Sequence, residues 1–275
     1  ALGSKLNTAL LPASLILLEI LFFQDLSTPQ RRKRITLLAI GSGVLLALAC
    51  IGFLWAWKGN PVAYFERAYQ GRPFTLAERL LTQPRILWFY LSQMLWPLPG
   101  RFSLVHEIQI STSLLSPWTT LPALVGTGAV VVFGALRIRR QPFIALAILF
   151  FFLNHLIEST VLPLELAFEH RNYLPTMFLF VPVAMALKYG LDAVPTQRSL
   201  LRGTLMAGIV ILIVALGLAT HSRNSMWTDK KGFWEDALVK APHTARPYLQ
   251  LAAYHEGQNH WPLALKLYHH SLRLY

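Results

Sequence analysis

The chain alternates long apolar runs with short polar connections. A helix of about 20 apolar residues is long enough to cross the hydrocarbon core of a bilayer. Six windows have roughly that length, at about 6–24, 35–57, 117–136, 143–160, 173–190 and 204–221. The pattern therefore predicts an all-α chain with a polytopic helical membrane domain of about six spans.

Basic clusters between the apolar runs predict the orientation of this domain. The connections carry RRKR at 31–34 and RIRR at 137–140, and the connection of the last two windows carries Lys188, Arg198 and Arg202. Cytoplasmic loops are enriched in Lys and Arg, so these clusters are assigned to the cytoplasmic side. The assignments agree only if an even number of crossings separates RRKR from RIRR.

The segment 75–98 decides that parity. Its apolar part is short for a span, contains Ser92 and Gln93, and is rich in aromatic residues. Such a segment suits an interfacial or re-entrant helix better than a span. We expect it at the outer surface. Residues 58–116 then form one outer region, and the residues after His221 lie on the same side of the membrane.

The C-terminal residues 222–275 change character and predict a second domain after the membrane part at 1–221. Their spacing fits the 34-residue helix-turn-helix unit of tetratricopeptide repeats. The matching positions are Ala237 and Pro242 of an earlier unit, then Tyr248, Leu251, Ala252, Asn259, Trp261, Ala264, Tyr268 and Ser271. An ordinary helical hairpin packed on the membrane domain is the alternative. Repeats of this kind present a surface for a protein or peptide partner.

Composition supports the membrane assignment. Hydrophobic residues make up 54% of the chain and charged residues 14%, against about 25% charged in soluble domains. The formal net charge of +12 falls in clusters beside apolar runs, which favours contact with membrane lipids and predicts no nucleic-acid partner. Cys50 is the sole cysteine, so an intrachain disulfide is excluded. Because the chain starts at Ala1, we expect it to be the C-terminal part of a longer protein.

Ionisable groups near membrane spans are candidate functional residues, because each costs about 2.5–3.5 kcal/mol at the bilayer centre. Lys5 begins the first window, where it either reaches the lipid headgroups or binds an anionic substrate. Glu19 lies towards the inner end of that window and is expected to be structural. His106 and Glu107 form an adjacent imidazole and carboxylate in the outer region, a weak candidate for acid-base chemistry.

Two polar groups flank one short outer loop. Asn154, His155 and Glu158 end the fourth window, where they either line a cavity or cap the helix; they are too few for a metal site. Glu169, His170 and Arg171 precede the fifth window. There a helix N-terminus and the Arg171 guanidinium would favour phosphate, with Glu169 holding the guanidinium. An ion pair fixing the loop is the alternative. We expect the two groups to converge on one pocket.

Several short motifs occur together in a characteristic order. They are SKLNTALLP, LTQPRILWFYLSQMLWPLP, STSLLSPWTTLP, FFLNHLIES and FEHRNYLP, followed by the repeat-like tail. In this order they resemble the C-terminal half of the transmembrane and tetratricopeptide-repeat O-mannosyltransferase-like proteins. That family belongs to the membrane glycosyltransferases of the GT-C class.

The resemblance implies transfer of a sugar from a polyprenyl-phosphate donor to an acceptor, expected to be a protein. It implies that this happens at the extracytoplasmic face of a bacterial cytoplasmic membrane, with the lipid-phosphate sugar as donor and no cofactor. Arg171 and Lys5 match the family's basic positions that hold the lipid phosphate, and His170, Glu169, His155, Glu158 and Asn154 would shape the site.

The chain departs from the family pattern in two respects. Leu6 stands where the family has Glu, and no acidic pair follows a first span. The catalytic Asp is therefore expected outside this chain. A non-catalytic scaffold that recruits partner proteins through its repeats is the alternative function, and a transporter is a third.

Overall fold

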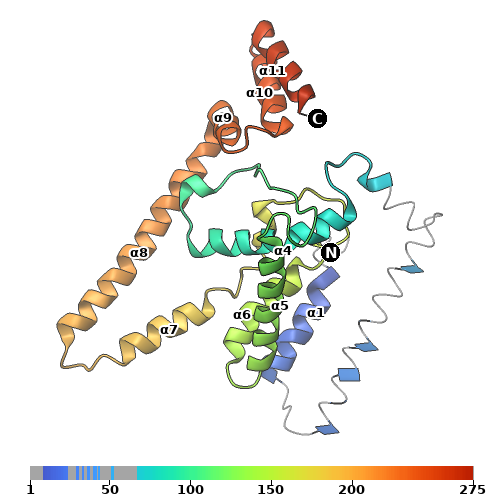
Figure 1. The fold of residues 1–275 in the computed structure, drawn as a ribbon. Coiled ribbons are helices and arrows are strands. Elements are labelled where there is room, and N and C mark those ends of the chain that lie inside the picture. Colours follow the sequence, from blue (N-terminus) through green and yellow to red (C-terminus); the bar gives the residue numbers. More distant parts are fainter. Residues whose placement is uncertain are drawn as a thin grey trace. The chain divides into compact units, whose positions relative to one another are not determined.

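The computed structural model describes residues 9–23 and 67–274, together with isolated positions between 29 and 52. Every regular element in this part of the chain is a helix (Figure 1). The predicted all-α class is confirmed.

The chain divides into two compact units. The first contains the residues up to Arg85, Ile110–Glu165 and Tyr173–Val183; the second contains Ile86–Gln109, Leu166–Asn172 and Ala184–Tyr275. Both α4 (Leu76–Leu95) and α7 (Val181–Asp192) are divided between them. The boundary predicted after residue 221 stays a prediction.

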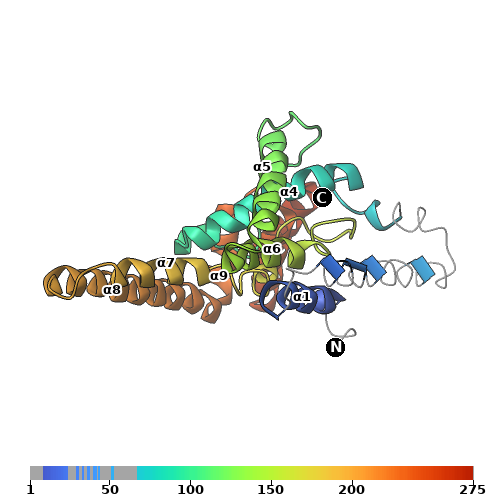
Figure 2. The ribbon, with the colours of Figure 1, turned by 90° about the horizontal axis from the view of Figure 1, so that it is seen from below.

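The core of the first unit lies between α1 (Leu11–Leu18), with its π-helical extension η2 (Glu19–Phe23), and α6 (Pro142–His155). Figures 1 and 2 show α1 beside α6. Leu21, Leu146 and Phe150 form this core with Ala145. The preceding helix, α5 (Thr120–Arg137), packs on α6 at Gly134, where an added Cβ would lie 2.8 Å from Ile148 Cγ2. Close packing of α5 on α6 therefore needs glycine there.

Two of the predicted spans have the length and apolar composition to cross a membrane. Within the described part these are α5 and α8 (Ser199–Ser225), which continues through η5 (Met226–Thr228). The helices at Leu11–Phe23 and Pro142–His155 are apolar but shorter. The window 35–57 lies mostly outside the described residues, so the expected six spans stay a prediction.

The fifth window differs from the expected continuous helix. Residues 173–180 form turns, and α7 begins only at Val181. Pro175 and Pro182 account for this, because proline lacks the amide hydrogen that a helix interior requires and is tolerated in the first turn.

The helix α4 lies on the segment expected to be interfacial. It begins with a reciprocal capping arrangement: the Thr75 amide donates to Glu78 Oε2 at 2.8 Å, and the Glu78 amide donates to Thr75 Oγ1 at 3.3 Å. It does not have the apolar composition of a candidate span. The prediction that this segment is helical is confirmed, and its place at the membrane surface stays a prediction.

Arg79 of α4 fixes the irregular backbone that follows α6. Its side chain is 0% exposed. Its Nε donates to Thr160 O at 2.8 Å, its Nη2 to Glu158 O at 2.6 Å, and its Nη1 to Leu164 O. One guanidinium therefore donates hydrogen bonds to three backbone carbonyls of the nonhelical segment that follows α6.

The second unit ends in three short helices. These are α9 (Lys230–Lys240), α10 (Ala245–Gly257) and α11 (Trp261–Arg273). The side chains of Phe233, Trp234 and Leu251 form its core, on which Leu104 and Val105 pack.

The C-terminal residues form a helical hairpin, whose assignment to a tetratricopeptide repeat stays a prediction. The helices α10 and α11 are joined at Asn259, whose φ of 61° is left-handed, as expected for the turn residue. Four of the expected small or apolar positions are buried: Leu251, Ala252, Ala264 and Ser271.

Replacing Asn259 with valine should destabilise the hairpin. A β-branched residue in the left-handed region costs about 1–2 kcal/mol, whereas glycine adopts it freely. We expect Asn259→Val to reduce the hydrogen-exchange protection of α10 and α11, and Asn259→Gly to preserve it. Gln258→Val is the matched control, since φ there is −97°. Equal protection in Asn259→Val and Gln258→Val would contradict the prediction.

Replacing Arg79 with methionine should destabilise the first unit strongly. The variant leaves three carbonyls without their donor, at a cost of about 3–5 kcal/mol. Denaturant unfolding in detergent measures it. Arg72→Met is the control, because Arg72 forms a solvent-exposed ion pair with Glu165 at 2.7 Å, worth at most about 1 kcal/mol. Similar losses in both variants would refute the role given to Arg79.

Candidate functional site

The candidate site is centred on the short 3₁₀ helix η4 (Glu169–Asn172) of the second unit. The sequence predicted that Glu169, His170 and Arg171 begin a membrane helix. In the structure the turns of residues 173–180 follow η4 instead. Phosphate binding here therefore has to rest on side chains and not on a helix N-terminus.

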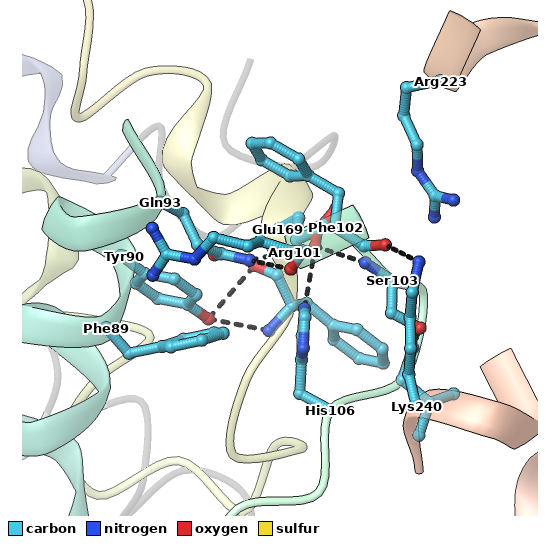
Figure 3. Close-up of polar contacts among 12 residues, drawn as sticks. Phe89, Tyr90, Gln93, Arg101, Phe102, Ser103, His106, Glu169, Arg223 and Lys240 are labelled. Carbon is cyan, nitrogen blue, oxygen red and sulfur yellow. Dashed lines mark hydrogen bonds and ion pairs between the residues drawn. The ribbon is translucent and has the colours of Figure 1, made fainter. Parts of the chain in front are cut away.

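Glu169 accepts hydrogen bonds from three residues, one in α4 and two in the loop after it, through one carboxylate oxygen. Its Oε1 lies 2.7 Å from the Ser103 amide nitrogen, 2.8 Å from His106 Nε2 and 3.3 Å from Gln93 Nε2 (Figure 3). Both the Glu169 and His106 side chains are largely buried. These contacts differ from the expectation that Glu169 holds the guanidinium of Arg171.

The residues around this carboxylate are themselves fixed. Phe89 packs edge-on against the His106 ring at a centroid distance of 4.9 Å. The Tyr90 hydroxyl accepts from the Phe168 amide at 2.7 Å and donates to the Phe168 carbonyl at 3.1 Å. Tyr90 therefore holds the backbone immediately before Glu169.

The segment that carries Ser103 and His106 is anchored at its start. Arg101 Nη1 donates to the carbonyls of Ser92 at 2.8 Å and Trp96 at 3.0 Å, which caps the end of α4. Lys240 Nζ of α9 donates to the Phe102 carbonyl at 2.8 Å (Figure 3). The Glu169 site therefore depends on α4, η4 and α9 together.

Basic side chains gather around the ring of Phe168. The guanidinium of Arg171 lies 5.1 Å from its centroid and that of Arg246 lies 5.5 Å from it. The His170 ring stacks on it at 5.2 Å. Arg171 is buried, while His170 and Arg246 are exposed.

The other predicted site residues have mixed outcomes. Asn154 is buried, and its Nδ2 donates to Phe150 O at 3.0 Å and Ser14 Oγ at 3.2 Å, which favours the structural reading. The buried His155 packs its ring edge-on against Phe151. Glu107 Oε2 accepts from the His243 amide at 3.4 Å, so the adjacent His106 and Glu107 have separate partners.

Two expectations stay predictions. Asn154, His155 and Glu158 belong to the first unit and Glu169–Arg171 to the second, so their convergence on one pocket is not decided. Lys5 lies outside the described residues. Among the residues that the structure describes, no group of three or more His, Cys, Asp or Glu is placed to hold a metal ion.

Sequence reasoning missed the partners that complete the site. Gln93 and Ser103 contact Glu169 of η4, and Tyr90 contacts the preceding Phe168, across 66 to 78 residues. Arg246 lies near Phe168 from α10. Gln93 carried a signal, because an amide inside an apolar stretch needs a buried partner.

No protein-family model, curated protein or solved structure matched the chain. The family resemblance therefore rests on the sequence motifs alone.

The arrangement offers two kinds of chemistry side by side in the second unit. A carboxylate bonded to an imidazole can orient a hydroxyl or move a proton. Guanidinium groups next to an aromatic ring can bind phosphate through charge-assisted hydrogen bonds, with sugar or lipid packed on the ring.

A double-mutant cycle should show that His106 and Glu169 stabilise each other. We expect a coupling free energy of about 0.5–3 kcal/mol between His106→Gln and Glu169→Gln, because the two side chains are in direct contact. Denaturant unfolding of both single variants and the double variant measures it. The exposed neighbour Glu107→Gln should change stability by no more than about 0.5 kcal/mol. Additive effects of the two site substitutions would rule out the pairing.

Proposed function

We propose that the protein acts as a membrane glycosyltransferase, or as its C-terminal half, that uses a polyprenyl-phosphate sugar donor. The acceptor is a protein, and transfer takes place at the extracytoplasmic face. The catalytic base lies outside this chain. The proposal combines the motif resemblance with the charged groups around η4.

The observation that carries the proposal is the cluster of Arg171, Arg246 and His170 around Phe168. A lipid-linked phosphate presents negative charge next to apolar and sugar groups, and this cluster offers cations beside an aromatic face. In the proposed complex Arg171 and Arg246 bind the donor phosphate. Glu169, with His106, orients sugar hydroxyls.

Membrane attachment in this proposal is provided by α5 and α8, the two described helices with suitable length and composition. The remaining predicted spans complete a polytopic domain in a bacterial cytoplasmic membrane. The helices α9, α10 and α11 begin a tetratricopeptide-repeat array outside it.

The hairpin favours a second candidate function, a scaffold without catalysis. Its buried positions and the left-handed Asn259 are those expected of a repeat unit. Trp261, Leu263, Leu265 and Leu272 are exposed on α11 and could contact a partner protein. A scaffold would use these groups and have no need of the η4 cluster.

Arg246→Gln should impair sugar transfer by the full-length protein in membranes. Loss of one charge-assisted phosphate contact is expected to lower kcat/KM for the donor about 10- to 100-fold. Arg246 is exposed, so its loss should leave the fold intact, whereas Arg171→Lys tests the buried position. Arg273→Gln, an exposed substitution on α11, is the control.

The same assay separates the two functions. Unchanged donor kinetics in both Arg246→Gln and Arg171→Lys would refute the phosphate site. Absence of transfer from every polyprenyl-phosphate sugar tried, with the full-length protein folded, would leave the scaffold as the better proposal.

A further inference from the structure

A cavity of about 210 Å³ lies in the second unit, apart from the Glu169 contacts. Pro97, Pro99 and Phe102 form one wall, and the last turns of α8 form the other through Leu216, Ala219 and Arg223. One water molecule needs about 10–15 Å³ by the same measure. The cavity therefore has room for a group much larger than water.

The cavity wall on α8 changes from apolar to cationic along the helix. Leu216, Ala219 and Arg223 are spaced three and four residues apart, so they share one face. Leu216 and Ala219 supply the apolar part, and Arg223 with Asn224 supplies the polar end. The ligand that matches this wall has an apolar chain attached to a polar, negatively charged group.

The surroundings of the cavity suit a bilayer surface. None of the apolar window of α8 is buried within the protein. Next to the lining prolines, Leu95, Trp96 and Leu98 are 63%, 65% and 52% exposed. Tryptophan is enriched where the hydrocarbon core meets the headgroups, and an arginine at a helix end reaches the same level.

The charge at the polar end is net positive. Arg223 Nη1 lies 3.0 Å from Asp236 Oδ2, and Lys240 Nζ lies 2.7 Å from Asp236 Oδ1. Two cations thus share one carboxylate. Lys240 also donates to the carbonyl of Phe102, which lines the cavity, so the positive charge is held at the cavity itself (Figure 3).

We propose that this cavity binds an anionic phospholipid of the surrounding bilayer. An acyl chain packs against Phe102, Leu216 and Ala219, and the phosphate is bound by Arg223 and Asn224. A bound lipid of this kind would brace α8 against the segment that leads from α4 to the Glu169 site. The inference goes beyond glycosyl transfer and requires only that α8 lies in a bilayer.

Lipid titration of the purified full-length protein, followed by native mass spectrometry, tests this. Phosphatidylglycerol, phosphatidylcholine and a polyprenyl phosphate are the three probes. Ala219→Trp fills the cavity and should weaken phosphatidylglycerol binding about tenfold or more. Leu218→Trp, an exposed position in the same helical turn, should leave it unchanged.

A second variant keeps the test decisive if Ala219→Trp does not fold. Arg223→Gln retains the Asp236–Lys240 pair and should remove the preference for phosphatidylglycerol over phosphatidylcholine. Arg202→Gln at the opposite end of α8 should keep that preference. Arg202 is a comparable control for Arg223 because it too lies near a carboxylate, with its guanidinium 4.0 Å from Asp192.

Three outcomes would overturn the proposal. They are equal binding of the two phospholipids by the unaltered protein, unchanged binding in folded Ala219→Trp, and stronger binding of the polyprenyl phosphate than of phosphatidylglycerol. The last would identify the occupant as a donor lipid. Sugar transfer is not the readout, so this proposal and the glycosyltransferase proposal can fail separately.

Discussion

Three long cationic side chains, Arg79, Arg101 and Lys240, donate hydrogen bonds to irregular backbone in the described part of the chain. Where a helix ends in apolar surroundings, its carbonyls have no amide partners and leaving them unpaired is costly. In the first unit Arg79 donates hydrogen bonds to three carbonyls after α6. In the second unit Arg101 donates to two carbonyls at the end of α4, and Lys240 donates to the carbonyl of Phe102. Each unit therefore contains buried or half-buried cations whose task is to hold a nonhelical segment in place.

At the Glu169 site a negatively charged side chain has the corresponding role, because it accepts hydrogen bonds where the cations donate them. Here a carboxylate accepts from the Ser103 amide and from two side chains, and Tyr90 satisfies both backbone groups of Phe168. The chemically interesting residues thus lie on irregular backbone that is held from several directions. Such support positions side chains as a regular helix would, without requiring η4 to continue into one. It also explains why Arg171 and Arg246 can lie near one ring while the neighbouring Glu169 faces other donors.

Local pattern was sufficient to predict the parts of this structure that depend on neighbours in sequence. The spacing of Leu251, Ala252, Ala264 and Ser271 predicted the α10–α11 hairpin, and Asn259 its turn. The polar and aromatic content of 75–98 separated α4 from the candidate spans. Hydropathy failed at 173–180, because it counts apolar side chains and ignores the missing amides of proline. The pairing of His106 with Glu169 spans 63 residues, and no local pattern contains it. Arg79 was overlooked because its partners are carbonyls, which every residue has.

These contacts change what the net positive charge implies about ligands. A net charge of +12 would ordinarily imply a surface that attracts polyanions. Arg79 is buried among carbonyls, Arg101 caps α4, and Lys240 is bonded to Asp236 and to the carbonyl of Phe102. These side chains contribute to the formal charge but are engaged within the protein. Arg246 and His170, by contrast, are exposed at an aromatic ring. A compact ligand that presents its negative charge beside an apolar group fits such a site better than an extended polyanion, which would need a continuous basic surface.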